Sequence, residues 1–226
     1  LEGCRKARMA HLCYASSSSV YGANTELPFQ EDHRVDRPVS LYAATKRANE
    51  LMAESYSASF GISCTGLRFF TVYGPWGRPD MALFIFTRAI LEGKPIRVFN
   101  GGDMLRDFTY IDDIVEAVTA IMEQPHPGEK GGPQSSSLPL SRLFNIGHGS
   151  PVKLMDFVHA VEHALGKKAQ IELAPMQVGD VQATYASTEK LRAEIGYAPS
   201  TPIAVGVERF VAWYRAHYAG TGRSAA

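Results

Sequence analysis

A tyrosine and a lysine four positions apart, Tyr42 and Lys46, are the residues whose types and spacing most directly suggest chemistry. On a helix, residues with this spacing share one face. An ammonium beside a phenol favours the phenolate and lowers the phenol's pKa from about 10 towards neutrality. A phenol tuned in this way can act as general base and general acid near pH 7. Such pairs are also frequent by chance, so the elements around this one must decide its meaning.

The segments around the pair predict a parallel α/β sheet. Residues 10–15 and 62–70 are short apolar runs, typical of strands buried on both faces. Between them the pattern predicts a helix that begins at about Ser40, a capping residue, and ends by Gly61. Ser17 follows the first strand, at the carboxyl end where open α/β sheets bind ligands. A hydroxyl there can hold a substrate oxygen while the phenol takes its proton.

The rest of the chain continues the alternation of strands and helices. Helices are predicted over residues 81–91, 154–165 and 205–217, and short strands over 96–99, 108–111 and 144–146. Asp112 is expected to cap a helix that runs to about residue 123. Residues 125–139 are rich in Pro, Gly and Ser and predict a surface loop, and residues 220–226 are expected to fray.

Composition narrows the function classes. The formal net charge is +0, and no basic stripe is interleaved with aromatic residues, which argues against a nucleic-acid partner and against a membrane partner in this segment. The three cysteines have no metal spacing and favour a reducing compartment, so we expect a cytoplasmic protein. His159 and His163 are four apart, but with no evident third ligand we expect no metal site.

Several longer motifs resemble one family. Tyr42-x-x-x-Lys46 with an upstream serine resembles the signature of short-chain dehydrogenases/reductases. The extended, nucleotide-sugar branch of that family is similar in four stretches, which are YASSSSVYG (14–22), LRFFTVYGPWGRPD (67–80), RDFTYIDD (106–113) and FNIG (144–147). The resemblance covers nearly the whole chain and is strongest to UDP-glucuronate 4-epimerases. It implies an α/β fold, the C-terminal part of a Rossmann-like parallel sheet with a smaller α/β substrate-binding lobe.

The resemblance also implies roles for individual residues. Tyr42 would be the catalytic base, Lys46 its partner and a ligand of the NAD ribose, and Ser17 the hydroxyl on the sugar's O4. The cofactor-binding set implied is Ser16, Tyr42, Lys46, Phe69 and Val72. The substrate-binding set implied, for a UDP-sugar, is Ser17, Ser18, Ser19, Thr71, Arg78, Ala82, Arg97, Phe99, Arg106 and Asp180.

Within the substrate-binding set, arginines would hold anionic groups, since a guanidinium binds a diphosphate or a carboxylate through paired hydrogen bonds. Arg78 and Arg106 would take these positions, and Arg97 and Phe99 would border the uracil. Gln177 stands where some hexose 4-epimerases carry an arginine, which puts one anionic contact in doubt.

The sequence departs from the family at one important place, because the Gly-rich phosphate loop of the first βαβ unit is absent. We therefore expect a chain that lacks roughly 100 residues of the dinucleotide-binding half, at about 30 residues per βα repeat, and that is inactive alone. Residues 1–75 would complete the NAD-binding domain. Residues 76–226 would form mainly the nucleotide-sugar lobe, with about 107–147 returning to the Rossmann sheet. The family resemblance also implies a homodimer.

The reaction implied is NAD-dependent 4-epimerisation of a UDP-sugar, most simply UDP-glucuronate to UDP-galacturonate through a 4-keto sugar. Dehydratases and UDP-glucuronate decarboxylases of the family carry a carboxylate near the serine cluster, and Ser17, Ser18 and Ser19 offer none. A UDP-N-acetylhexosamine 4-epimerase is a close alternative, and a UDP-glucuronate decarboxylase is a further one. An inactive fragment or a UDP-binding module is the alternative of another class.

Overall fold

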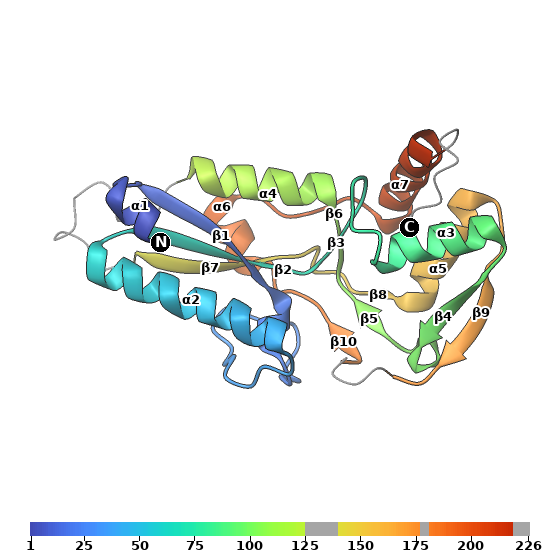
Figure 1. The fold of residues 1–226 in the computed structure, drawn as a ribbon, viewed down its shortest axis with the longest axis horizontal. Helices are drawn as coiled ribbons and strands as arrows, with labels where there is room; N and C mark the ends of the chain where they lie inside the picture. The colour runs from blue at the N-terminus through green and yellow to red at the C-terminus, as the bar shows by residue number, and fades with distance from the viewer. Residues whose placement is uncertain (125–139, 177–180, 219–226) are drawn as a thin grey trace. The chain divides into compact units, whose positions relative to one another are not determined.

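The computed structural model describes residues 1–124, 140–176 and 181–218 (Figure 1). The chain divides into two compact units. Unit 1 consists of residues 1–70, 115–147 and 186–198, and unit 2 of residues 71–114, 148–185 and 199–226. Each unit contains parallel strands and helices, so the predicted α/β class is confirmed.

Unit 1 is built on a three-stranded sheet in the order β1-β2-β7, with all strands parallel. The strands are β1 (His11–Ser17), β2 (Ser63–Phe69) and β7 (Ser141–Ile146). Their register pairs Ser17 with Phe69 and Phe69 with Ile146, so the three strands end together at one edge. The 3₁₀ helix η1 (Ser18–Tyr21) follows β1 directly, and the short helices α1 (Glu2–Lys6) and α6 (Glu189–Ile195) also belong to this unit.

Helix α2 (Leu41–Phe60) runs along the sheet of unit 1 (Figure 1). It begins as predicted, because the Ser40 hydroxyl accepts a hydrogen bond from the amide of Ala43 at 3.1 Å. It ends at Gly61, which has the left-handed conformation, with φ of 67°, that a helix C-cap requires. The residues that α2 buries include Ala43, Ala53 and Ser57, whose small side chains permit close packing.

Unit 2 surrounds its core with short paired strands. β3 (Thr71–Tyr73) pairs with β6 (Phe108–Tyr110), and β4 (Pro95–Phe99) with β9 (Gln170–Ala174), both in parallel. A third sheet has the order β10-β5-β8 and consists of β10 (Ala183–Thr184), β5 (Leu105–Arg106) and the antiparallel β8 (Val152–Lys153). The 3₁₀ helix η2 (Asn100–Gly102) follows β4.

Three helices supply most of the core of unit 2, namely α3 (Ala82–Glu92), α5 (Leu154–Leu165) and α7 (Ile203–Tyr218). Aromatic rings meet at its centre, where Phe108 stacks on Phe157 with ring centroids 4.2 Å apart. Gly93 and Gly166 end α3 and α5 in the left-handed conformation, which glycine adopts without strain.

One predicted helix start is wrong. Helix α4 (Ile111–Glu123) begins directly after β6, so Asp112 lies in its first turn instead of capping it. Asp112 and Asp113 there still face the positive end of the helix dipole. The Asp113 carboxylate accepts hydrogen bonds from the amides of Ser200 and Thr201. The loop expected at residues 125–139 and the fraying expected at residues 220–226 lie outside the described residues.

No helix in the described ranges is long and apolar enough to span a membrane.

Candidate active site

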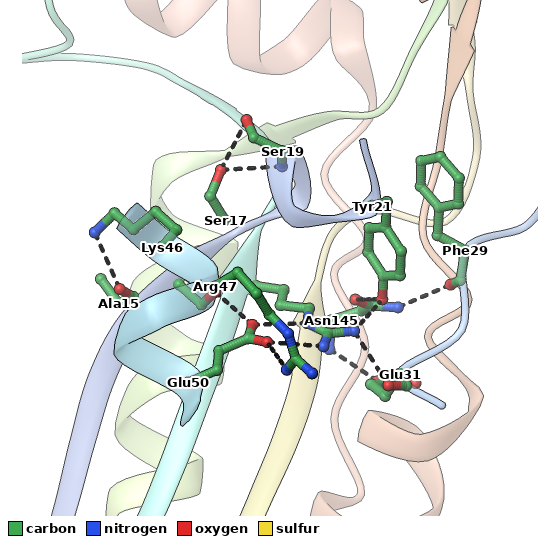
Figure 2. Close-up of polar contacts among 12 residues, drawn as sticks. Ala15, Ser17, Ser19, Tyr21, Phe29, Glu31, Lys46, Arg47, Glu50 and Asn145 are labelled. Carbon is green, nitrogen blue, oxygen red and sulfur yellow. Dashed lines mark hydrogen bonds and ion pairs between the residues drawn. The ribbon is translucent and has the colours of Figure 1, made fainter. Parts of the chain in front are cut away.

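The carboxyl edge of the sheet in unit 1 presents the serine cluster. Ser17 is the last residue of β1, and its hydroxyl accepts a hydrogen bond from the Ser19 amide at 3.2 Å and donates one to the Ser19 hydroxyl, also at 3.2 Å (Figure 2). Phe69, the register partner of Ser17, ends β2 beside it. The edge therefore carries hydroxyls with an aromatic ring on the neighbouring strand.

Tyr42 and Lys46 lie on consecutive turns of α2, the helix that runs along this sheet. The Lys46 ammonium lies 5.8 Å from the centroid of the Tyr42 ring. It also donates to the carbonyl oxygen of Ala15 in β1 at 3.1 Å, as Figure 2 shows. This bond uses one of the three donors of the ammonium and leaves two for a ligand. The phenol is 54% exposed, so a substrate can reach it.

A buried ion pair lies beneath this edge, and sequence reasoning missed it. Arg68 in β2 and Glu50 in α2 form two hydrogen bonds, from Nε to Oε1 at 2.9 Å and from Nη2 to Oε2 at 3.0 Å. Burial by itself would raise the pKa of Glu50, but the hydrogen bonds and charge of Arg68 outweigh it and lower that pKa. Glu50 is therefore an anion that binds a cation inside the unit.

The Arg68 guanidinium extends this network to the loop segments. Its Nη1 donates to the Tyr21 hydroxyl at 3.0 Å and to the Glu31 carbonyl oxygen at 3.1 Å. Tyr21 in turn donates to Asn145 Oδ1 at 2.6 Å, and the Asn145 side chain donates to the Phe29 carbonyl oxygen at 2.8 Å (Figure 2). Burial raises the pKa of Tyr21 to about 12, so this phenol stays neutral.

Four of the expected binding residues lie in unit 2 around one apolar hollow. Thr71 and Val72 belong to β3, Ala82 is the first residue of α3, and Arg78 lies in the loop between them. Phe84 and Phe108 form part of its wall. The Arg78 side chain is exposed and donates from Nε to Asp80 Oδ1 at 3.1 Å.

The other expected binding residues of unit 2 lie on β4 and β5. Arg97 and Phe99 are two apart on β4 and share a face, and the Arg97 guanidinium lies 5.3 Å from the centroid of the Phe99 ring. Arg106 on β5 donates from Nη1 to the carbonyl oxygens of Leu105 at 2.9 Å and of Gln182 at 3.1 Å. Asp180 and Gln177 lie outside the described residues.

The expected site residues that belong to unit 1 are Ser16, Ser17, Ser18, Ser19, Tyr42, Lys46 and Phe69. The remaining described members belong to unit 2. The Ser16 side chain is buried and donates to Glu50 Oε1 at 2.6 Å, so any contact of Ser16 with a cofactor would come from its main chain. Among the residues that the structure describes, no cluster of three potential metal ligands occurs, at His159 and His163 or elsewhere.

A second residue that sequence reasoning missed is Asp107. Its buried carboxylate accepts hydrogen bonds from the amides of His148, at 2.7 Å, and Gly149, at 3.0 Å. It thereby fixes the loop that follows β7. The available signal was an acidic residue directly before the apolar run of residues 108–111.

The fold and the edge chemistry define a class of α/β protein with a parallel sheet and a hydroxyl–phenol–ammonium set at its carboxyl edge. Residues 1–147 match the NAD dependent epimerase/dehydratase family. A relative from Escherichia coli O111:H-, described as an uncharacterized 37.6 kDa protein in the cld 5' region, is 57% identical over 96% of this chain and 67% of its own length. The chain therefore belongs to this family, and the predicted resemblance is confirmed. The prediction of an NAD-dependent enzyme of the nucleotide-sugar epimerase class is confirmed with it.

Other relatives carry functional names. A probable UDP-glucuronate 4-epimerase from Rhizobium meliloti is 48% identical, over 96% of this chain and 66% of that protein. Among solved structures, MoeE5 in complex with UDP-glucuronic acid and NAD has a TM-score of 0.83 at 32% identity and covers 96% of this chain and 68% of its own. UDP-glucuronic acid 4-epimerase from Bacillus cereus, in complex with UDP-glucuronic acid and NAD, has a TM-score of 0.83 at 29% identity, covering 96% and 65%. These likenesses confirm the Rossmann-like class of the fold and NAD as the cofactor of the family.

Proposed function

We propose that this chain carries the acid/base and substrate-binding parts of a UDP-sugar 4-epimerase that converts UDP-glucuronate to UDP-galacturonate. The observation that carries the proposal is the placement of Ser17 at the carboxyl edge of the sheet, with Tyr42 and Lys46 on the helix beside it. The relatives named as UDP-glucuronate 4-epimerases support the choice of sugar. The residues themselves support the type of reaction.

Each of the three groups has a defined task in this proposal. Ser17 holds the O4 oxygen of the sugar through its hydroxyl. Tyr42 removes the O4 proton and later returns it, which its exposed position on α2 permits. Lys46, fixed on Ala15, places a positive charge near the phenol.

The residues at this edge fit NAD. The remaining donors of Lys46 suit ribose hydroxyls, Phe69 offers an apolar surface at the strand end, and the Ser16 main chain is a further candidate. Val72 of unit 2 stays a prediction for the cofactor. NAD held there would supply reversible hydride transfer at C4 of the sugar. The reaction therefore consumes no reductant.

Binding of the UDP group is assigned to unit 2. Arg78 and Arg106 are proposed to bind the diphosphate or the uronate carboxylate, and Arg97 and Phe99 to border the base. Thr71 and Ala82, which line the same apolar hollow as Arg78, are proposed to contact the sugar, as are Ser18 and Ser19 in unit 1. Asp180 stays a prediction for the UDP ribose.

We also propose a cytoplasmic homodimer that associates through α2. This helix exposes Leu41, Leu51 and Met52, which are 83%, 54% and 48% exposed. Apolar side chains of this size on one helix are typical of surfaces that are covered in an assembly. Light scattering of the purified protein at several concentrations tests the proposal, which a monomer at every concentration would contradict.

The function is tested by incubating the natural protein that carries this sequence with NAD and UDP-glucuronate, and separating the UDP-sugars by chromatography. We expect UDP-galacturonate without net formation of NADH. A UDP-pentose with released CO₂ would establish decarboxylation instead, which the lack of a carboxylate among Ser17, Ser18 and Ser19 argues against.

Two further outcomes separate the remaining alternatives. Conversion of UDP-N-acetylglucosamine but not of UDP-glucuronate would keep the acid/base groups and change the sugar. UDP binding by titration calorimetry without conversion of either sugar would refute the proposed reaction and favour a binding module.

A further inference from the structure

The Glu50 carboxylate collects four hydrogen bonds from three different elements. Oε1 accepts from the Ser16 hydroxyl at 2.6 Å and from Arg68 Nε at 2.9 Å. Oε2 accepts from Arg68 Nη2 and from Arg47 Nη1, both at 3.0 Å. Figure 2 shows the carboxylate facing Arg47 below the turn that bears Lys46. A carboxylate has about four acceptor positions, so this one is fully occupied by protein groups.

Two hydrogen bonds, one from Ser16 to Glu50 and one from Lys46 to Ala15, join α2 to the end of β1. Glu50 lies one helical turn beyond Lys46, and Ser16 directly precedes Ser17. The bond from Lys46 to the Ala15 carbonyl oxygen and the bond from Ser16 to Glu50 therefore connect successive residues of β1 to successive turns of α2. The helix can neither slide along the strand nor rotate without breaking one of them.

The same ion pair also reaches the turn that carries the other serines. Arg68 donates to the hydroxyl of Tyr21, the last residue of η1, and Ser18 and Ser19 are the first residues of that 3₁₀ helix. One buried pair thus holds the helix, the strand end and the serine turn.

Stability alone is a weak reason for such a pair. Replacing a buried ion pair by packed apolar residues is often neutral or stabilising, so a pair placed here needs another explanation. Catalysis supplies one, because acid/base groups must be held close to their productive geometry by the residues around them.

We propose that Glu50 and Ser16 are positioning residues, which hold the Ser17 hydroxyl in register with the Tyr42–Lys46 pair through the hydrogen bond between their side chains. This inference rests on the proposed function. Neither side chain touches the reacting atoms in this scheme. Each acts through its neighbour, Ser16 through Ser17 and Glu50 through the turn of α2 that carries Lys46.

The test compares Ser16→Ala with Arg47→Ala in the natural protein. Each variant removes one hydrogen bond to the same carboxylate. The Ser16 bond joins helix to strand, whereas the Arg47 bond, three residues away, stays within α2. We expect Ser16→Ala to lower kcat by about tenfold or more, since a displacement on the order of 1 Å can cost about a hundredfold. KM for the UDP-sugar and the occupancy of NAD should not change, and Arg47→Ala should keep kcat within about twofold.

A second readout does not depend on activity. Amide hydrogen exchange at residues 41–46 should become faster in Ser16→Ala and should be unchanged in Arg47→Ala. Equal exchange in the two variants, or equal effects on kcat, would overturn the positioning role while leaving the proposed function in place. An inactive wild-type protein would instead refute the proposed function, and the exchange comparison would still decide whether the bond from Ser16 to Glu50 fixes the start of α2.

Discussion

Replacing Glu50 by glutamine should strongly destabilise unit 1. The change keeps the shape of the side chain and removes its charge. Arg68 and Glu50 have side chains that are 1% and 2% exposed, so water cannot replace the lost partner of the guanidinium. Breaking a buried pair in this way costs about 3–5 kcal/mol of folding free energy. The glutamine oxygen can still accept the hydrogen bond from Ser16, so we expect a loss of folding free energy of about 3 kcal/mol, the lower end of that range.

Two matched variants provide a reference for the expected loss of folding free energy in Glu50→Gln. Glu54→Gln makes the same chemical change one turn further along α2 at an exposed position, and we expect an effect within about 0.5 kcal/mol. Arg47→Ala removes the partner whose side chain is 27% exposed and leaves Arg68 in place. Its effect should be about 1 kcal/mol or less, as for partly exposed ion pairs.

The assay must observe unit 1 itself. Both tryptophans, Trp76 and Trp213, belong to unit 2, so tryptophan fluorescence does not report directly on the sheet that holds Glu50. Urea unfolding followed by circular dichroism, combined with amide exchange in β2 and α2, gives the required free energies. A loss for Glu50→Gln no larger than that for Glu54→Gln would refute the buried ion pair and the reasoning built on it.

Three further predictions follow from the same contacts. Because the pKa of Glu50 lies below its ordinary value of 4.5, its contribution to stability is present above that pH and is lost as the pH falls through the folded-state pKa. In unfolding measured across pH, Glu50→Gln should therefore show a weaker loss of stability than the wild type as the pH falls below 4.5. Gly206→Ala should lower the stability of unit 2, because the new Cβ would lie 2.1 Å from the buried Tyr73 hydroxyl. Overpacking of this kind costs about 1–3 kcal/mol, which is more than the gain in helix propensity from alanine. Urea unfolding followed by tryptophan fluorescence measures the effect, and a higher urea midpoint for the variant would contradict that contact. Tyr42→Phe should reduce kcat by at least about a hundredfold with the protein still folded, and retention of most activity in the epimerase assay would defeat its assignment as acid/base group.

Local chemistry explains why much of the fold could be predicted. Ser40 and Gly61 mark the ends of α2 through bonds and a backbone conformation that depend on nearby residues alone. The apolar runs of β1 and β2 indicate strands because both faces of a parallel sheet are buried. The strands β5, β8 and β10, with two residues each, are too short to show a period, and only tertiary pairing defines them.

The polar network could be predicted only in part. An arginine inside the apolar run of residues 62–70 is a signal, since a charged side chain in a buried strand needs a partner. The partner is not readable from one sequence, because Glu31, Glu50 and Glu54 were all available. The structure selects Glu50, whose position on the buried face of α2 depends on how the helix packs on the sheet.

The two units differ in how firmly they hold their proposed functional groups, and this difference has a kinetic consequence. In unit 1, Ser17 and Lys46 lie beside residues that are fixed by the Glu50 and Arg68 network. In unit 2, Arg78 and Arg97 are exposed, and Arg97 lies on a two-stranded sheet. Groups that stabilise the transition state need fixed positions. Groups that bind the UDP equally strongly in the ground state and in the transition state can move to contact it when it binds. Removing the bond from Ser16 to Glu50 should therefore act on kcat, and substitutions of Arg97 mainly on KM.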